Sequence, residues 1–337
     1  MKIAAITGIR QAEITERPDP KAQASWAVVK IHSAPMCTEF KMFTDGEKSS
    51  CIGHEASGEI IECGAGASVK KGDRVVVQPL YACGQCKMCF SGNFILCEHQ
   101  LSPEPIAGND RVCGTYAQYI AKPDHLLTAL PDDISYDHGA MACCGLGPTF
   151  GAMECMRLEA YETILIAGLG PVGLGGVINA SHRGARVIGL DANPYRASLA
   201  RQLGAEIVIN PADNAAAQIK DFTKGNGVDC AIDASGVPAA QRLLLDSLRR
   251  GGKMTFVGEA KEFNIHISND MIRKSIILAG SWHYNILGYP KVLDVIRRNT
   301  GRLDKLITHH LPLSRVVEGW EIQLTGKCGK IVLHPWE

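Results

Sequence analysis

Residues 1–80 alternate short apolar runs with turn-forming residues. Apolar and β-branched side chains dominate residues 26–31, 58–61 and 73–77, and glycine or charged residues separate these runs. Runs of this length bounded by turn residues predict β-strands. Two further strands are predicted at 115–121 and 126–130, after a cysteine-rich stretch with little apolar content. The N-terminal part of the chain is therefore expected to be β-rich.

The hydrophobic pattern changes near residue 160, where apolar runs begin to alternate with amphipathic segments of helical length. Such alternation predicts a parallel sheet with helices on both faces, the doubly wound α/β arrangement. The predicted strands cover residues 163–167, 186–190, 206–209, 228–232, 253–257 and 275–279. The remaining chain predicts a helix at 291–298 and a last strand at 331–333.

Length and charge narrow the class of protein. The chain has 337 residues, enough for two domains, and Lys plus Arg equals Asp plus Glu at 35 each. Without a basic stripe, nucleic acid is not an expected partner. The N-terminus lacks the apolar core and cleavage site of a signal peptide, and no stretch approaches the roughly 20 apolar residues that span a bilayer. These features favour a cytoplasmic enzyme without a membrane partner.

Thirteen cysteines suggest metal rather than disulfides in such a chain, and four of them are closely spaced. Two residues separate Cys83 from Cys86 and Cys86 from Cys89, and seven residues separate Cys89 from Cys97. Short gaps let one loop turn three thiolates toward one point, and the longer gap returns the chain for the fourth. Four protein ligands predict a closed, structural zinc site in a lobe at 83–97. Unrelated thiols and an iron–sulfur cluster are the alternatives.

A glycine-rich turn follows the predicted strand at 163–167. It comprises Gly168, Leu169, Gly170, Pro171, Val172 and Gly173, and a segment compatible with a helix comes next. The first glycine makes the tight turn, the second admits a pyrophosphate, and the third lets the helix pack on the strand. The pyrophosphate is then expected at the helix N-terminus, where free N–H groups favour an anion.

The choice of dinucleotide depends on the end of the second predicted strand. Asp191 lies there, at the distance from the turn where a carboxylate can bind both ribose hydroxyls. That carboxylate would repel the 2′-phosphate of NADP. Arg196 is close enough in sequence to weaken the argument, but Asp191 favours NAD.

The zinc lobe, the dinucleotide motif and the sequence Gly53, His54, Glu55 together resemble the zinc-containing medium-chain dehydrogenase/reductase family. The resemblance covers essentially the whole chain. It implies a GroES-like β-rich catalytic domain made from residues 1–146 and 286–337. It also implies an NAD-binding Rossmann domain at 147–285, inserted between the two parts.

The resemblance also implies a second, catalytic zinc in the interdomain cleft. Its ligands would be Cys37, His54 and Cys144, the last favoured over Cys143 by the sequence that follows, with Glu55 as a possible fourth. Three protein ligands leave one position for water or the substrate oxygen, so that zinc acts as a Lewis acid while hydride passes to the nicotinamide. The sorbitol branch of the family usually has Glu at the third ligand position and the alcohol dehydrogenases have Cys.

The proton relay departs from the family pattern, in which a hydroxyl and an acidic residue follow the zinc cysteine after one intervening residue. In this chain Thr38 and Glu39 follow Cys37 directly. A one-residue deletion makes Thr38 the relay hydroxyl and Glu39 the acidic neighbour, and this alignment is favoured. Without a gap, Glu39 takes the hydroxyl position.

Aromatic residues are candidates for the walls of the substrate pocket. Phe43 and Phe94 are expected on its apolar side. By the resemblance, Trp282, His283 and Tyr284 lie near the nicotinamide.

The implied function is the interconversion of a secondary alcohol or polyol with its ketone, by hydride transfer to or from NAD. Primary alcohol or aldehyde oxidation is an alternative that Cys144 favours, whereas the segment 280–290 is similar to the polyol branch. A non-catalytic nucleotide-binding member would have lost zinc ligands that are all present here. A homodimer or homotetramer is implied, formed through the edge strand at 275–282, which would otherwise expose an apolar run.

Overall fold

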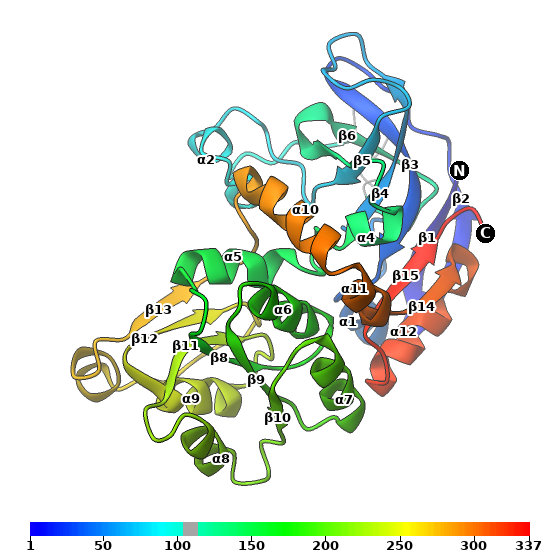
Figure 1. Ribbon diagram of the computed structural model, residues 1–337. Coiled ribbons are helices and arrows are strands. Elements are labelled where there is room, and N and C mark those ends of the chain that lie inside the picture. The colour runs from blue at the N-terminus through cyan, green and yellow to red at the C-terminus, as the bar shows by residue number, and fades with distance from the viewer. Residues whose placement is uncertain (104–113) are drawn as a thin grey trace. The chain divides into compact units, whose positions relative to one another are not determined.

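The computed structural model describes residues 1–103 and 114–337 of the chain (Figure 1). The chain divides into two compact units. The first contains residues 1–145, 285–297 and 307–337, and the second contains residues 146–284 and 298–306. No helix within the described parts of the chain is long and apolar enough to cross a membrane.

The first unit is β-rich. Its strands are β1 (Lys2–Gly8), β2 (Gln11–Glu16), β3 (Trp26–Pro35), β4 (Ala56–Cys63), β5 (Arg74–Val77), β6 (Tyr119–Pro123), β7 (Leu127–Ala129), β14 (Ile307–Pro312) and β15 (Lys330–His334). β1 and β2 form a separate antiparallel pair. The others form one sheet in the order β14-β15-β3-β4-β5-β7, and β6 also pairs with β3. The sheet thus joins strands from both ends of the chain.

Short helices and an aromatic core complete this unit. The helices are α1 (Phe40–Asp45), α2 (Lys87–Phe90), α4 (Tyr136–Ala140), α10 (Tyr289–Arg298) and α12 (Val316–Thr325), with 3₁₀ turns at Phe94–Leu96, Asp124–Leu126, Ile286–Gly288 and Leu313–Arg315. Trp320 of α12 is fully buried, stacked on Phe43 with ring centroids 4.7 Å apart. Phe43 is itself fully buried, so its predicted place on a pocket wall is wrong. Its ring fills the core between α1 and α12.

The second unit is the predicted doubly wound fold. Its strands are β8 (Thr163–Ala167), β9 (Arg186–Leu190), β10 (Ile207–Ile209), β11 (Val228–Asp233), β12 (Leu248–Phe256) and β13 (Ile277–Gly280). They pair in the order β10-β9-β8-β11-β12-β13, and every pair is parallel. All five residues of β8 are buried, as expected for a central strand covered on both faces.

Helices cover both faces of this sheet (Figure 1). They are α5 (Gly147–Met156), α6 (Pro171–His182), α7 (Pro194–Leu203), α8 (Ala215–Phe222), α9 (Pro238–Ser247) and α11 (Thr300–Leu306), with a π-helical turn at Ile267–Ile272. α5, α6 and α7 pack in sequence against one another, and α8 packs against α9. The right-handed crossovers between parallel strands produce these two layers.

One boundary differs from the sequence prediction. Residues 298–306 were expected in the catalytic domain, but they belong to the second unit. The reason is the packing of α11 against α6 and α7, which buries Leu303 and Leu306 completely. Asn299 also bonds His182 at the end of α6, with 3.0 Å between the amide nitrogen and Nδ1.

Candidate metal centres and dinucleotide site

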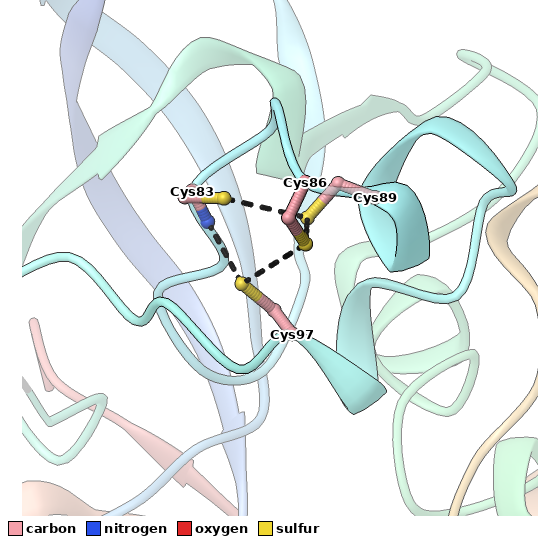
Figure 2. Close-up of side chains that lie close together, drawn as sticks. All are labelled: Cys83, Cys86, Cys89 and Cys97. Carbon is pink, nitrogen blue, oxygen red and sulfur yellow. Dashed lines mark hydrogen bonds between the residues drawn. The ribbon is translucent and has the colours of Figure 1, made fainter.

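Four cysteines converge in a small lobe of the first unit (Figure 2). Cys86 caps the N-terminus of α2, Cys89 lies within it, and Cys97 follows the 3₁₀ turn at Phe94–Leu96. Cys83 precedes Gly84, whose φ of 75° makes the tight turn back toward Cys86. The close spacing seen in the sequence therefore becomes convergence in space.

The sulfur separations fit one zinc ion. The Cys83–Cys89, Cys86–Cys89 and Cys86–Cys97 sulfurs are 3.9, 3.5 and 3.9 Å apart. A tetrahedron with Zn–S bonds of about 2.3 Å has edges of about 3.8 Å. An iron–sulfur cluster lies between its thiolates and would hold them farther apart. The hydrogen bond from the backbone N–H of Cys89 lowers the pKa of the Cys86 thiol to about 6, which favours the thiolate that zinc binds.

A second cluster contains Cys37, His54, Glu55 and Cys144, whose ligand atoms lie within 4.8 Å of one another. Cys37 follows β3, His54 and Glu55 precede β4, and Cys144 lies in the turn after α4. The His54 Nε2 atom is 3.2 Å from the Cys144 sulfur. The hydrogen bond from Cys144 holds the pKa of Cys37 well below its usual range, so one thiolate is already favoured. Two thiols and an imidazole are a donor set that suits zinc.

Cys143 does not join this cluster. Its buried thiol faces the backbone carbonyl of Val77, 3.4 Å away. Burial raises its pKa to about 12, so the neutral thiol is the stable form. Cys144 is therefore the better candidate of the two.

Glu39 orients the histidine of the second cluster. Its Oε1 atom lies 2.7 Å from His54 Nδ1, while its Oε2 atom accepts hydrogen bonds from the Tyr116 hydroxyl at 2.9 Å and the Cys37 backbone at 3.0 Å. A carboxylate on Nδ1 fixes the ring tautomer that presents the Nε2 lone pair to a metal. Burial alone would lower the pKa of His54, but the hydrogen bonds to Cys37 and Glu39 raise it well above its usual value.

Gly53 makes this approach possible. It has a φ of 85°, and a Cβ atom there would lie 2.4 Å from the ring of Tyr116. Only glycine therefore lets the backbone before His54 pass so close to the tyrosine that supports Glu39.

Glu55 forms a fully buried ion pair with Lys330, the first residue of β15, at 2.5 Å. Among residues 1–103 and 114–337, the second carboxylate oxygen of Glu55 has no hydrogen-bond partner. Burial alone would lower the pKa of Lys330, but attraction to Glu55 and Cys37 raises it above its usual value. Gln323 of α12 adds a hydrogen bond to the Cys37 carbonyl at 3.1 Å.

The glycine-rich turn lies where the sequence predicts it, between β8 and α6. Gly168 has a φ of 83°, and a Cβ atom on Gly173 would lie 1.9 Å from the Gly168 carbonyl oxygen. A Cβ atom on Gly170 would meet no described residue within 4 Å. Gly170 is also the N-cap of α6 and makes no side-chain cap, so the first N–H groups of the helix face an open cradle. An anion such as pyrophosphate fits there.

Asp191 follows β9 and is bound to the same turn. Its Oδ2 atom accepts a hydrogen bond from the Leu169 backbone at 2.7 Å, and its Oδ1 atom accepts one from Asn193 at 2.8 Å. The Nε atom of Arg196, in α7, is buried and has no hydrogen-bond partner within the described parts of the chain. Asp191 keeps lone pairs for hydroxyl donors and brings negative charge to the turn. Both features fit NAD.

The remaining aromatic candidates have different surroundings. Phe94 packs edge-on against His125 in the four-cysteine lobe, with ring centroids 5.5 Å apart. Trp282 is 59% exposed. Tyr284 is buried and stacks on His283 at 4.7 Å, which gives both residues a packing role in the second unit.

Sequence reasoning missed Tyr116, Gln323 and Lys330 around the second cluster. Tyr116 and Gln323 carry no motif. Lys330 lies within a run of buried residues, the only signal that could have drawn attention to it. The mutual contact of Glu39 and His54 depends on the fold, although Glu39 itself was a candidate.

We expect Cys86→Ser to remove the zinc of the lobe and leave the other centre filled. Loss of one of four thiolates opens a closed tetrahedral site, so zinc content should fall by about one ion per chain and the melting temperature should fall with it. Elemental analysis and thermal unfolding measure both. Cys155→Ser, which changes an exposed cysteine in α5, is the control and should change neither. Unchanged zinc content in Cys86→Ser would contradict the assignment.

We expect Glu39→Gln to weaken zinc binding at the second cluster by about 10–100-fold, because an amide holds the His54 tautomer less firmly than a carboxylate. Competition with a chromophoric chelator measures the affinity. Glu47→Gln, at an exposed position just after α1, serves as the control. Equal affinities for the two variants would show that Glu39 does not support the site.

Comparison with known proteins supports the two-part organisation. A model of the alcohol dehydrogenase GroES-like domain matches residues 23–132, and a model of the zinc-binding dehydrogenase family matches residues 171–298. Sorbitol dehydrogenase from Bacillus subtilis (strain 168) is 31% identical, over 99% of this chain and 97% of that protein. L-threonine 3-dehydrogenase from Symbiobacterium thermophilum is 29% identical, over 96% of this chain and 94% of that protein.

A solved structure gives the same result. The crystal structure of 2R,3R-butanediol dehydrogenase from Bacillus subtilis matches with a TM-score of 0.86 and 27% identity, over 99% of both chains. The predicted fold class, with a GroES-like part and a Rossmann part, is confirmed. The chain therefore belongs to the zinc-containing medium-chain dehydrogenase/reductase family and is an NAD-dependent zinc alcohol or polyol dehydrogenase.

Proposed function

We propose that the enzyme interconverts a secondary alcohol of the polyol or sugar-alcohol type with its ketone. The observation that carries this proposal is the cluster of Cys37, His54 and Cys144, which offers three protein ligands to one metal ion. Sorbitol, threonine and 2,3-butanediol, named in the three relatives, each carry a secondary hydroxyl beside a second polar group. A vicinal diol or amino alcohol is therefore the substrate class that we favour.

Cys37, His54 and Cys144 would hold the catalytic zinc, and Glu39 would keep His54 in the tautomer that binds metal. When bound there, zinc supplies a Lewis acid that makes a substrate hydroxyl more acidic. Glu55 is a candidate fourth ligand, since Lys330 holds one of its oxygens and the other has no partner among the residues that the structure describes. The ion pair with Lys330 holds its carboxylate close to the other ligands.

The hydroxyl of Thr38 would carry the substrate proton toward water. Thr38 is exposed and adjacent to Cys37, whereas both oxygens of Glu39 are already bonded to His54, Tyr116 and the Cys37 backbone. This division of contacts supports the alignment in which Thr38 is the relay and Glu39 is the acidic neighbour.

The second unit would bind the dinucleotide, with the pyrophosphate at Gly168, Gly170 and Gly173 against the N-terminus of α6. Pro171 and Val172 begin that helix, and their backbone belongs to the same cradle. Asp191 would bind the ribose hydroxyls, with Arg196 nearby in α7. When bound, NAD supplies the acceptor for hydride. Cys83, Cys86, Cys89 and Cys97 would hold a structural zinc that rigidifies the lobe.

Primary alcohol or aldehyde oxidation is the second candidate. Cys144 favours it, because the alcohol dehydrogenase branch has Cys as the third ligand and the sorbitol branch usually has Glu. The substrates for which the three relatives are named favour secondary alcohols instead. A substrate panel discriminates between the two candidates.

We also propose a homodimer or homotetramer formed through β13, the last strand of the six-stranded sheet. Ile277 in this strand is 59% exposed, and Trp282, just after it, is equally exposed. Exposed apolar edges of this kind pair with another chain. Sedimentation of a monodisperse monomer at micromolar concentration would refute this assembly.

The function is tested with a panel of polyols, sugars, amino alcohols and simple alcohols, scored by NADH formation. We expect the highest kcat/KM for a secondary alcohol with an adjacent polar group. We also expect NAD to be preferred over NADP by about tenfold or more, a difference of about 1.4 kcal/mol in transition-state binding. Highest activity on primary alcohols would select the alternative. No activity on any alcohol in zinc-replete protein would reject both candidates.

We expect Thr38→Val to lower turnover by about tenfold or more, with the largest loss at low pH, where loss of the substrate proton is slowest. A pH profile of kcat measures the effect. Thr44→Val in α1, where the hydroxyl donates a hydrogen bond to the Lys41 carbonyl, is the matched control. Turnover equal to the unsubstituted enzyme across the pH range would remove Thr38 from the relay.

A further inference from the structure

A third group of potential metal ligands lies in the first unit and shares no residue with the two zinc clusters. It contains Asp137, His310 and His334, one ligand atom of each lying within 4.8 Å of the others. Neither the family resemblance nor the proposed reaction uses these three residues. They are also far apart in the sequence, so only the fold brings them together.

The sheet explains why the two histidines meet. β14 and β15 are parallel, with His310 opposite Val332 and Pro312 opposite His334. His310 and His334 are therefore two steps apart on the same face, since side chains alternate along a strand. Their rings are 5.4 Å apart, centroid to centroid. Asp137 reaches them from α4, which packs on β3 and β4.

Both imidazoles point a nitrogen at the same carboxylate. His310 Nδ1 is 3.2 Å from Asp137 Oδ2, and His334 Nε2 is 3.3 Å from the same oxygen and 3.0 Å from Oδ1. A tetrahedral ion with ligand bonds of about 2.0–2.1 Å has ligands about 3.3–3.4 Å apart. The two edges that meet at Asp137 Oδ2 therefore fit one small divalent cation. The sulfur separations in the four-cysteine lobe were matched to zinc by the same comparison with the edge of a coordination tetrahedron.

A second carboxylate, that of Glu337, contacts the His334 ring on the nitrogen that faces away from Asp137. Glu337 Oε1 lies 3.1 Å from His334 Nδ1. In the tautomer that donates Nδ1–H to Glu337, the Nε2 lone pair faces Asp137. Two acceptors that face one another require a cation between them, either a proton or a metal. Glu39, His54 and Cys144 show the same arrangement at the catalytic cluster, with Nδ1 held by a carboxylate and Nε2 facing a ligand atom.

The group is accessible from solvent. The side chain of His310 is 50% exposed, whereas those of Asp137 and His334 are 23% and 19% exposed. An ion could reach the cluster without opening the fold, and water could complete its coordination. Two imidazoles and one carboxylate suit Zn²⁺ and neighbouring first-row transition metals, whereas Mg²⁺ and Ca²⁺ prefer ligands that are all oxygen.

We propose that Asp137, His310 and His334 form a third metal site, which takes Zn²⁺ from solution. The bound ion links α4 to both C-terminal strands of the sheet, so its effect is on the stability of the first unit. The site is independent of the alcohol chemistry proposed above, and its failure would leave that proposal unchanged.

The test is a titration of the full-length, zinc-replete enzyme with Zn²⁺ at slightly alkaline pH, because metal binding displaces protons from its ligands. Isothermal calorimetry should detect one further equivalent in the unsubstituted enzyme. His310→Ala and Asp137→Asn should weaken this binding by about tenfold or more, since each removes a ligand. His309→Ala is the matched control, because its side chain lies on the opposite side of β14 and bonds Thr308. It should bind like the unsubstituted enzyme.

A second measurement needs no substitution. Zn²⁺ should protect His310 from acylation by diethyl pyrocarbonate, as read by peptide mass spectrometry, and should not protect the exposed His99. The proposal is overturned if no further equivalent binds, if His310→Ala binds as the control does, or if Zn²⁺ leaves His310 equally reactive. Each of these outcomes would leave the cluster as an ion pair between Asp137 and the two histidines, without a metal.

Discussion

Buried charge around Cys37, His54 and Cys144 is the constraint on which the first unit depends. Glu39, Glu55 and Lys330 are each buried, and each is compensated by a partner of opposite charge or by hydrogen bonds. An unpaired charge at such depth costs several kcal/mol. Because the partners come from β15, from the residues before β4 and from the start of α1, the cost is avoided only when these elements are assembled together. The cluster of candidate metal ligands and the fold of the first unit therefore form together.

In the second unit the main constraint is close packing of the backbone at the glycine-rich turn rather than the compensation of buried charge. The contact between Gly168 and Gly173 leaves no room for a side chain, whereas the space above Gly170 is open. Close packing on one side of the turn holds the open cradle on the other side in a fixed shape. Asp191 strengthens the turn by accepting the Leu169 N–H group. The anion site is thus organised before a ligand binds.

The sequence alone predicts the parts whose chemistry is local. The four cysteines and the glycine-rich turn are contiguous motifs, and the strands of both units produce clear hydrophobic runs. The roles of Glu39 and Lys330 are harder to predict from sequence. Their partners are His54 and Glu55, and no local sequence pattern indicates that these residues meet. The boundary at 298–306 was wrong for a similar reason, because the burial of Leu303 and Leu306 depends on α6 and α7. The prediction that Phe43 lines the substrate pocket was wrong, because the sequence does not distinguish a phenylalanine in the core from one on a pocket wall.

The pairing of Glu55 with Lys330 also affects the order of events during synthesis. The two residues are 275 positions apart, so a growing chain contains Glu55, His54, Cys37 and Cys144 long before β15 exists. The second unit, by contrast, has all six strands available once residue 280 has been made. Long-range contacts of this kind form late and slowly. Cys37, His54, Glu55 and Cys144 are therefore all synthesised, together with the strands of the second unit, before the cation that pairs with Glu55.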